Sequence, residues 1–223
     1  MSRQDEVPEL TVQIAFFLGL LILVVFVLPS VGMGDDHELR YSTVAATLLF
    51  GSGLSIAWRR RRLFVLSAIT SSFAIATKIW AVQTSSHSAA VLSEIGTLVG
   101  VLVISWVLML ETFRRKGPVT ASSIQSAVAV YLLFGLAWAN AYVIAMQQNP
   151  HSFQGALRVS WGAPEQWIYF SFTTLTTLGY GDITPLSPVA HSLAVGEALT
   201  GQLYLTVLLG RLIGKEMSYR KGD

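Results

Sequence analysis

Six stretches of the sequence are apolar, nearly free of charge and long enough to cross a lipid bilayer as helices. They are Leu10–Leu28, Ser42–Trp58, Leu63–Val82, Ala89–Leu110, Ala121–Met146 and Pro188–Ile213. The bilayer core has no water to satisfy exposed backbone groups, so a chain crosses it only as helices or as a closed barrel. Because runs of about 17–25 apolar residues suit helices, we expect an all-α membrane protein with six transmembrane helices.

The composition is also that of a membrane protein. Only 13% of the 223 residues are charged and 52% are hydrophobic, whereas soluble domains carry about 25% charged residues. The chain has no cysteine, which excludes disulfides and thiolate metal sites. The basic residues lie in short clusters beside apolar runs, a pattern that does not indicate nucleic acid binding.

Clusters of Lys and Arg indicate the orientation of the chain. They follow the second, fourth and sixth stretches: Arg59, Arg60, Arg61 and Arg62; Arg114, Arg115 and Lys116; and Lys215, Arg220 and Lys221, with Arg211 at the inner end of the sixth stretch. Positive charge concentrates in cytoplasmic loops, so both termini are expected in the cytoplasm. The membrane is expected to be the plasma membrane of the cell. The Arg59–Arg62 run is also a candidate contact for anionic lipid headgroups.

A seventh apolar stretch, Pro164–Leu175, is too short to cross the membrane and lies between the last two spans. Its length suits a re-entrant helix that enters from the outside. Pro164 and Glu165 are residue types favoured in a first helical turn. We expect the negative end of this helix to point at the segment that follows it.

That following segment, Thr176–Asp182, reads T-T-L-G-Y-G-D and suits the coordination of a dehydrated potassium ion. Such an ion needs a shell of oxygens, which successive backbone carbonyls supply when they all point inward. Gly179 and Gly181 reach the positive φ values that this requires. The Thr177 hydroxyl can add another ring of oxygens, and Tyr180 is expected to point away and pack against the short helix.

These residues resemble the potassium channel signature. Thr177–Gly181 reads T-L-G-Y-G where the family usually has T-V-G-Y-G, and the resemblance extends from about Ala121 to Gly214. It implies an outer helix, pore helix, selectivity filter and inner helix. Four copies of the chain would build the pore, since one chain supplies one filter segment. The implied ligands of K⁺, with no other cofactor, are Thr177, Leu178, Gly179 and Tyr180.

The resemblance implies passive K⁺ conduction by a homotetramer and no enzymatic activity. It divides the chain into a four-helix transmembrane domain, residues 1–116, and a pore domain with a short cytoplasmic tail, residues 117–223. The alternatives are a poorly selective cation channel of the same architecture and a silent or sensory subunit. A separate regulatory subunit is a further expected partner, because no sizeable domain follows the sixth span.

The fourth span does not have the pattern of a voltage sensor. Such a sensor needs several basic residues at every third position within a span. Ala89–Leu110 contains none, and its one charge is Glu94. The run Arg59–Arg62 is contiguous, so its side chains point all around a helix. We therefore expect a channel that is not intrinsically voltage-gated.

The sequence departs from the family in the pore helix, where Tyr169 and Phe170 occupy positions at which many relatives carry a Trp pair. Phe170 has no N–H to donate, so one hydrogen bond that braces the filter in relatives is expected to be absent. In the inner helix, Gly201 matches the family's hinge glycine, while close helix packing explains it equally well. Gln202 and Leu205 are expected toward the cavity.

Three charges lie within the spans: Lys78, Glu94 and Glu197. The first two are expected to form an ion pair across a short loop, or else to snorkel separately to the interface. Glu197 precedes Gln202 by five residues, which turns it roughly 140° away from the cavity at about 100° per residue.

Glu197 would then face the short helix or the fifth span. Thr173, Thr174 or Asn140 could donate a hydrogen bond to it there, and an uncharged acid, which can also donate, is the cheaper form to bury. The alternative is a ring of four carboxylates that lines the cavity.

Overall fold

The computed structural model describes residues 6–27, 38–57, 61–84, 86–114, 119–155 and 164–220. The helices are α1 (Glu6–Ile22), continued by the π-helix η1 (Leu23–Val27), α2 (Glu38–Ala57), α3 (Arg61–Thr84), α4 (His87–Arg114), α5 (Ala121–Gln148), α6 (Pro164–Leu175) and α7 (Pro188–Arg220). Two strands of two residues each, β1 (Phe153–Gln154) and β2 (Thr184–Pro185), pair antiparallel. This short pair is the one departure from the predicted all-α fold within the described residues.

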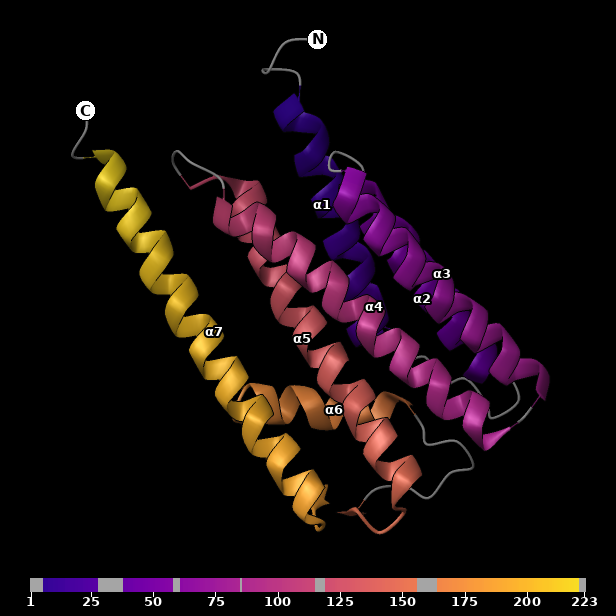
Figure 1. The fold of residues 1–223 in the computed structure, drawn as a ribbon. Helices are drawn as coiled ribbons and strands as arrows, with labels where there is room; N and C mark the ends of the chain where they lie inside the picture. The colour runs from indigo at the N-terminus through magenta and orange to yellow at the C-terminus, as the bar shows by residue number, and fades with distance from the viewer. Residues whose placement is uncertain are drawn as a thin grey trace.

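Four of these helices are long and apolar enough to cross a membrane: Arg61–Thr84, His87–Leu110, Ala121–Gln148 and Pro188–Lys215. They correspond to the predicted spans three to six. The apolar parts of α1 and α2, Thr11–Val27 and Ala46–Ile56, are shorter, so six crossings remain a prediction. The start of α1 and the end of α7 lie at the same end of the molecule (Figure 1), as an even number of crossings requires.

Helix α5 contacts α1, α4, α6 and α7, whereas α2 and α3 pack against α4. Both α4 and α1 pack along α5, and α6 lies across the space between α5 and α7 (Figure 1). One hydrophobic core runs from Ile14 on α1 through Ile104 on α4 and Leu133 on α5 to Leu208 on α7. The two predicted domains therefore share a core within one chain, and the predicted boundary after residue 116 lies outside the described residues.

The first helix reaches the predicted pore helix directly. The ring of Phe26 in η1 lies 5.9 Å from the ring of Phe172 in α6, centroid to centroid. On its other side Phe172 fits against Gly135 of α5, where a Cβ atom would lie 2.5 Å from the ring. A glycine at this position lets α6 approach α5 closely.

Two predicted boundaries differ from the structure. The helix α7 continues to Arg220, so most of the predicted cytoplasmic tail is helical. Arg61 and Arg62 form the first turn of α3 rather than a loop, and both are exposed. Of the other predicted basic positions, Arg114 is the last residue of α4. Outside the described residues lie Arg59, Arg60, Arg115, Lys116 and Lys221.

Candidate ion-conduction site

The filter segment Thr176–Asp182 begins where α6 ends in a Schellman motif. Leu178 N–H donates to the carbonyl of Thr173 over 2.8 Å, and Thr177 N–H donates to the carbonyl of Thr174 over 2.9 Å. The residue between helix and extended chain in such a motif adopts a left-handed conformation and is usually glycine. Here it is Thr177, with φ +60°.

A left-handed backbone recurs at every second residue of the filter segment. The φ angle is +60° at Thr177, +54° at Gly179 and +80° at Gly181. Leu178 and Tyr180 between them have no positive φ. This alternation lets successive carbonyls face the same side of the chain, which ordinary extended backbone does not. A β-branched residue rarely adopts positive φ, so Thr177 holds strain of order 1–3 kcal/mol, as backbones at functional sites often do.

The whole filter segment is exposed in the single chain. The Thr177 hydroxyl donates to the carbonyl of Thr176 over 2.6 Å. A Cβ atom at Gly179 or Gly181 would meet nothing within 4 Å. The backbone conformation alone therefore requires glycine there, and the open side is free to meet ions or other copies of the chain.

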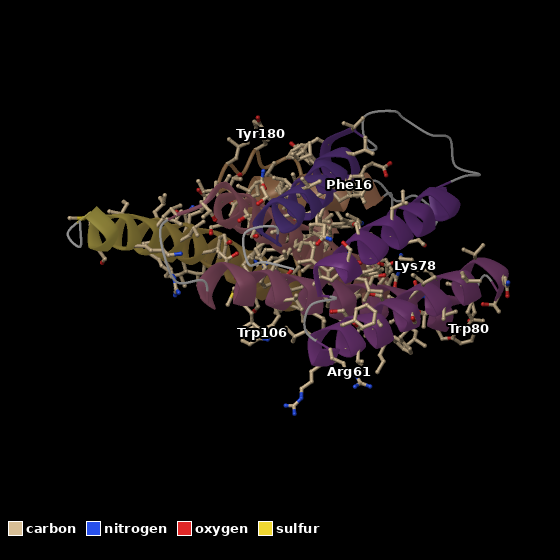
Figure 2. All side chains as sticks on the ribbon, turned by 90° about the horizontal axis from the view of Figure 1, so that it is seen from above. Phe16, Arg61, Lys78, Trp80, Trp106 and Tyr180 are labelled. Carbon is tan, nitrogen blue, oxygen red and sulfur yellow. The ribbon has the colours of Figure 1, made fainter. Side chains whose placement is uncertain are left out.

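The C-terminal end of the filter segment is braced by α6. The Tyr169 hydroxyl donates to Asp182 Oδ2 over 2.7 Å, and the Tyr169 ring stacks on that of Tyr180 at 6.3 Å between centroids. Tyr180 therefore packs against α6, as predicted, and points to the edge of the molecule (Figure 2). This hydrogen bond lowers the pKa of Asp182 and raises the pKa of Tyr169 to about 12.

The short β1–β2 pair fixes the segment that follows the filter. Phe153 lies opposite Pro185, and Gln154 lies opposite Thr184. Gly155, with φ +79°, touches the carbonyl of Asp182 so closely that a Cβ atom there would overlap it. The segment Phe153–Gly155, which follows α5, and the end of the filter segment are thus held together by backbone contacts.

The helix α7 touches the end of α6 at Gly201. A Cβ atom on Gly201 would lie 2.1 Å from the carbonyl oxygen of Leu175. The Tyr131 hydroxyl of α5 donates to the same carbonyl over 3.4 Å, and Tyr204 of α7 donates to the carbonyl of Ala127 over 2.8 Å. The sequence left two roles open for Gly201, a hinge or close helix packing, and the contact with Leu175 supports close packing.

The polar face of α7 points away from the rest of the chain. Gln202, Leu205 and Thr206 are exposed, and Gln202 and Thr206 lie one helical turn apart. The structure thus leaves Gln202 and Leu205 open on the side where the sequence predicts a cavity.

Glu197 lies on the opposite side of α7 and is fully buried. Tyr142 of α5 donates to its Oε2 atom, and Ser171 Oγ of α6 lies 2.5 Å from its Oε1 atom. Ser171 Oγ also lies 2.7 Å from the carbonyl of Gly135 on α5. Glu197 therefore links α5, α6 and α7 and is turned away from the exposed face of α7 that carries Gln202, which argues against the alternative of a carboxylate ring there.

The donors predicted for Glu197 were wrong. The hydroxyls of Thr173 and Thr174 donate to the carbonyl of Phe170 in their own helix, and the Asn140 amide donates to that of Leu136. Sequence reasoning missed Ser171 and Tyr142. Ser171 precedes Leu175 by one turn, as Glu197 precedes Gly201, and this matched spacing was the available signal.

The ion pair predicted in the first four helices is present. Lys78 Nζ of α3 lies 3.3 Å from Glu94 Oε1 of α4. Figure 2 shows Lys78 among the helices, whereas Trp80 and Trp106 point outward. Among the described residues, no three His, Asp or Glu side chains come together in a way that could hold a metal ion.

The sequence of the later part of the chain is similar to that of known channel proteins. Residues 127–215 match a family model described as ion channel. The chain is also 29% identical over 121 residues to protein LctB of Bacillus caldotenax, an alignment that covers 52% of this chain and 87% of that protein. No solved structure is significantly similar. Residues 127–215, which lie between the first turns of α5 and the last turns of α7, are therefore similar to an ion channel domain, and this indicates an ion channel.

Proposed function

We propose that the chain is a subunit of a tetrameric channel that conducts K⁺ passively and selectively. The observation that carries this proposal is the left-handed backbone at every second residue of Thr177–Gly181. Carbonyls aligned in this way can replace the hydration shell of a potassium ion. The helix α6 ends directly before them, so the negative end of its dipole favours a cation at the same place.

Exposed polar groups of the filter segment and of α7 support assembly around an axis. Thr176, Thr177, Gln202 and Thr206 are exposed in the single chain. Polar groups at membrane depth face a water-filled cavity or other protein, since lipid cannot satisfy them. Of the four long helices, α7 is the least buried. Three further copies would cover its apolar flanks and gather the four filter segments.

Ion flux from the pure protein tests the proposal. Reconstituted in liposomes with K⁺ on one side and Na⁺ on the other, the wild type should give a reversal potential near that of K⁺. A value near zero would indicate the alternative, a poorly selective cation channel. Absence of flux would indicate a silent subunit.

The Gly179→Ala variant locates selectivity in the filter. Its φ of +54° costs an L-residue about 1–2 kcal/mol in each copy. We expect loss of selective K⁺ flux from a variant that still assembles. Gly51→Ala is the matched control, because nothing lies within 4 Å of a Cβ atom at Gly51 and its φ is not positive. Selective flux through Gly179→Ala equal to that of the control would refute the assignment.

A further inference from the structure

We propose that Glu197 is an uncharged carboxylic acid that positions α6 beneath the filter, a role that rests on the channel function proposed above. The carboxyl group stands where three helices meet: its own α7, α5 through Tyr142 and α6 through Ser171. All three side chains are fully buried. The site is built by the fold and lies away from the open face that carries Gln202.

Counting protons assigns the uncharged form. Ser171 Oγ lies 2.7 Å from the carbonyl of Gly135 and 2.5 Å from Glu197 Oε1, but a serine hydroxyl carries one proton. An ionised Glu197 only accepts, so one of these two short contacts would then have no proton. In the neutral acid, Tyr142 donates to Oε2, Oε1–H donates to Ser171 Oγ, and Ser171 donates to the Gly135 carbonyl. Each proton is used once.

The surroundings of Glu197 favour the same assignment. The two side chains that meet its carboxyl oxygens are hydroxyls. A buried carboxylate without a cationic partner is strongly destabilising. Among the basic side chains that the structure describes, Lys78 pairs with Glu94. Arg211 follows Glu197 by 14 residues, about 21 Å along the helix at 1.5 Å per residue.

Contacts at two successive turns connect this acid to the filter. Glu197 meets Ser171, and one turn further along both helices Gly201 meets the carbonyl of Leu175. Between these contacts, the carbonyl of Thr173 accepts from the N–H groups of Leu178 and Gly179 in the filter segment. The position of α6 against α7 therefore sets the position of the filter backbone, and Glu197 acts on selectivity through Ser171 as a positioning residue.

Infrared spectroscopy of the purified full-length protein tests the charge. We expect the carbonyl stretch of a protonated carboxyl group in the wild type at neutral pH, shifted in D₂O and absent from Glu197→Gln. The glutamine keeps the shape and can reproduce the whole chain, accepting from Tyr142 and donating to Ser171. If the two spectra show no difference in this band, Glu197 is ionised and the assignment is overturned.

Reversal potentials of the reconstituted protein test the positioning role. Glu197→Gln should keep the K⁺/Na⁺ permeability ratio of the wild type, whereas Ser171→Ala and Tyr142→Phe should lower it about tenfold. Thr200→Ala is the control, since the Thr200 hydroxyl donates only within α7, to the carbonyl of Gly196.

Two results would overturn the positioning role. One is an unchanged ratio in both Ser171→Ala and Tyr142→Phe. The other is an equal fall in Thr200→Ala. A wild type without K⁺ selectivity would defeat the proposed function and the positioning role with it, while the infrared result would still decide the charge of Glu197.

Discussion

The Tyr169 hydroxyl donates to Asp182 Oδ2 over 2.7 Å, and this bond joins the middle of α6 to the C-terminal end of the filter segment. The neighbouring Phe170 is buried in a cluster of rings formed with Tyr142, Phe153 and Trp167. Phe170 has no side-chain donor, and the neighbouring Tyr169 supplies the hydrogen bond that braces the filter segment. The brace bonds an ionised carboxylate, so it depends on pH.

The direction of that dependence follows from the two pKa shifts. Because the pKa of Asp182 is lowered, the brace contributes fully above the ordinary Asp pKa of about 4 and is lost as the pH falls through the lower folded value. Because the pKa of Tyr169 is raised to about 12, its contribution is complete below about pH 10 and is lost as the pH rises through that value.

We therefore expect K⁺ currents that decay little when the pH on the outer side lies between about 5 and 9, because the brace keeps the filter segment in place over this range. Tyr169→Phe should make the current decay faster throughout this range, because the variant cannot brace Asp182. The wild type should approach the variant below about pH 4, and again as the pH rises through about 12. Current decay recorded from liposome patches at stepped external pH measures this. Equal decay in the wild type and the variant at neutral pH would contradict it.

Gly201→Ala should weaken the contact between α6 and α7. Its Cβ atom would lie 2.1 Å from the Leu175 carbonyl, so one helix must shift. Overpacking of this kind costs about 1–3 kcal/mol, more than the gain of about 1 kcal/mol from replacing a helical glycine. Gly210→Ala is the control, since nothing lies within 4 Å of a Cβ atom there.

Thermal unfolding in detergent separates packing from hinging at Gly201. We expect the midpoint to fall for Gly201→Ala and to stay level or rise for Gly210→Ala. If Gly201 instead serves mainly as a hinge, its variant would keep the midpoint of the wild type and change only the fraction of time that the channel is open.

Much of this fold could be predicted because membrane helices are recognised in a sequence by the length of their apolar stretches. The bounds of α6, Pro164 and Leu175, match the prediction, since a favourable first turn and a glycine-containing segment delimit it. The direction of Glu197 relative to Gln202 followed from helix geometry, once the resemblance to the family placed Gln202 toward the cavity. The partners of Glu197 did not, because they depend on how α5 and α6 cross α7, which no local pattern encodes.

The backbone of Thr177 was also beyond prediction. The glycines at 179 and 181 indicate positive φ, but a β-branched residue argues against it. Its left-handed conformation at +60° follows from the Schellman motif that closes α6. Local preference is overridden here by the hydrogen bonds of the helix end, at the position where the candidate ion site begins.

A double charge reversal should recover stability at the Lys78–Glu94 pair. Their side chains are largely buried and 3.3 Å apart, so Lys78→Glu or Glu94→Lys alone places two like charges together. The double variant restores an attractive pair. From the unfolding midpoints of all four proteins, we expect a coupling energy of about 0.5–3 kcal/mol. A double variant that loses as much as the two single variants combined would mean that the residues act independently.

The same ion pair bears on voltage. Glu94 is the one charge in Ala89–Leu110, and Lys78 balances it, so the α3–α4 hairpin carries almost no net charge at membrane depth. A voltage of 100 mV does about 2.3 kcal/mol of work on each charge that crosses the field, and voltage-gated channels move about 3–4 charges per subunit. We therefore expect no measurable gating current from the wild type when permeation is blocked. Glu94→Gln leaves Lys78 uncompensated and should raise the gating charge to at most about one per subunit. A wild-type gating charge of several units would show that other residues sense the field, because neither α3 nor α4 carries the charges required within its apolar span.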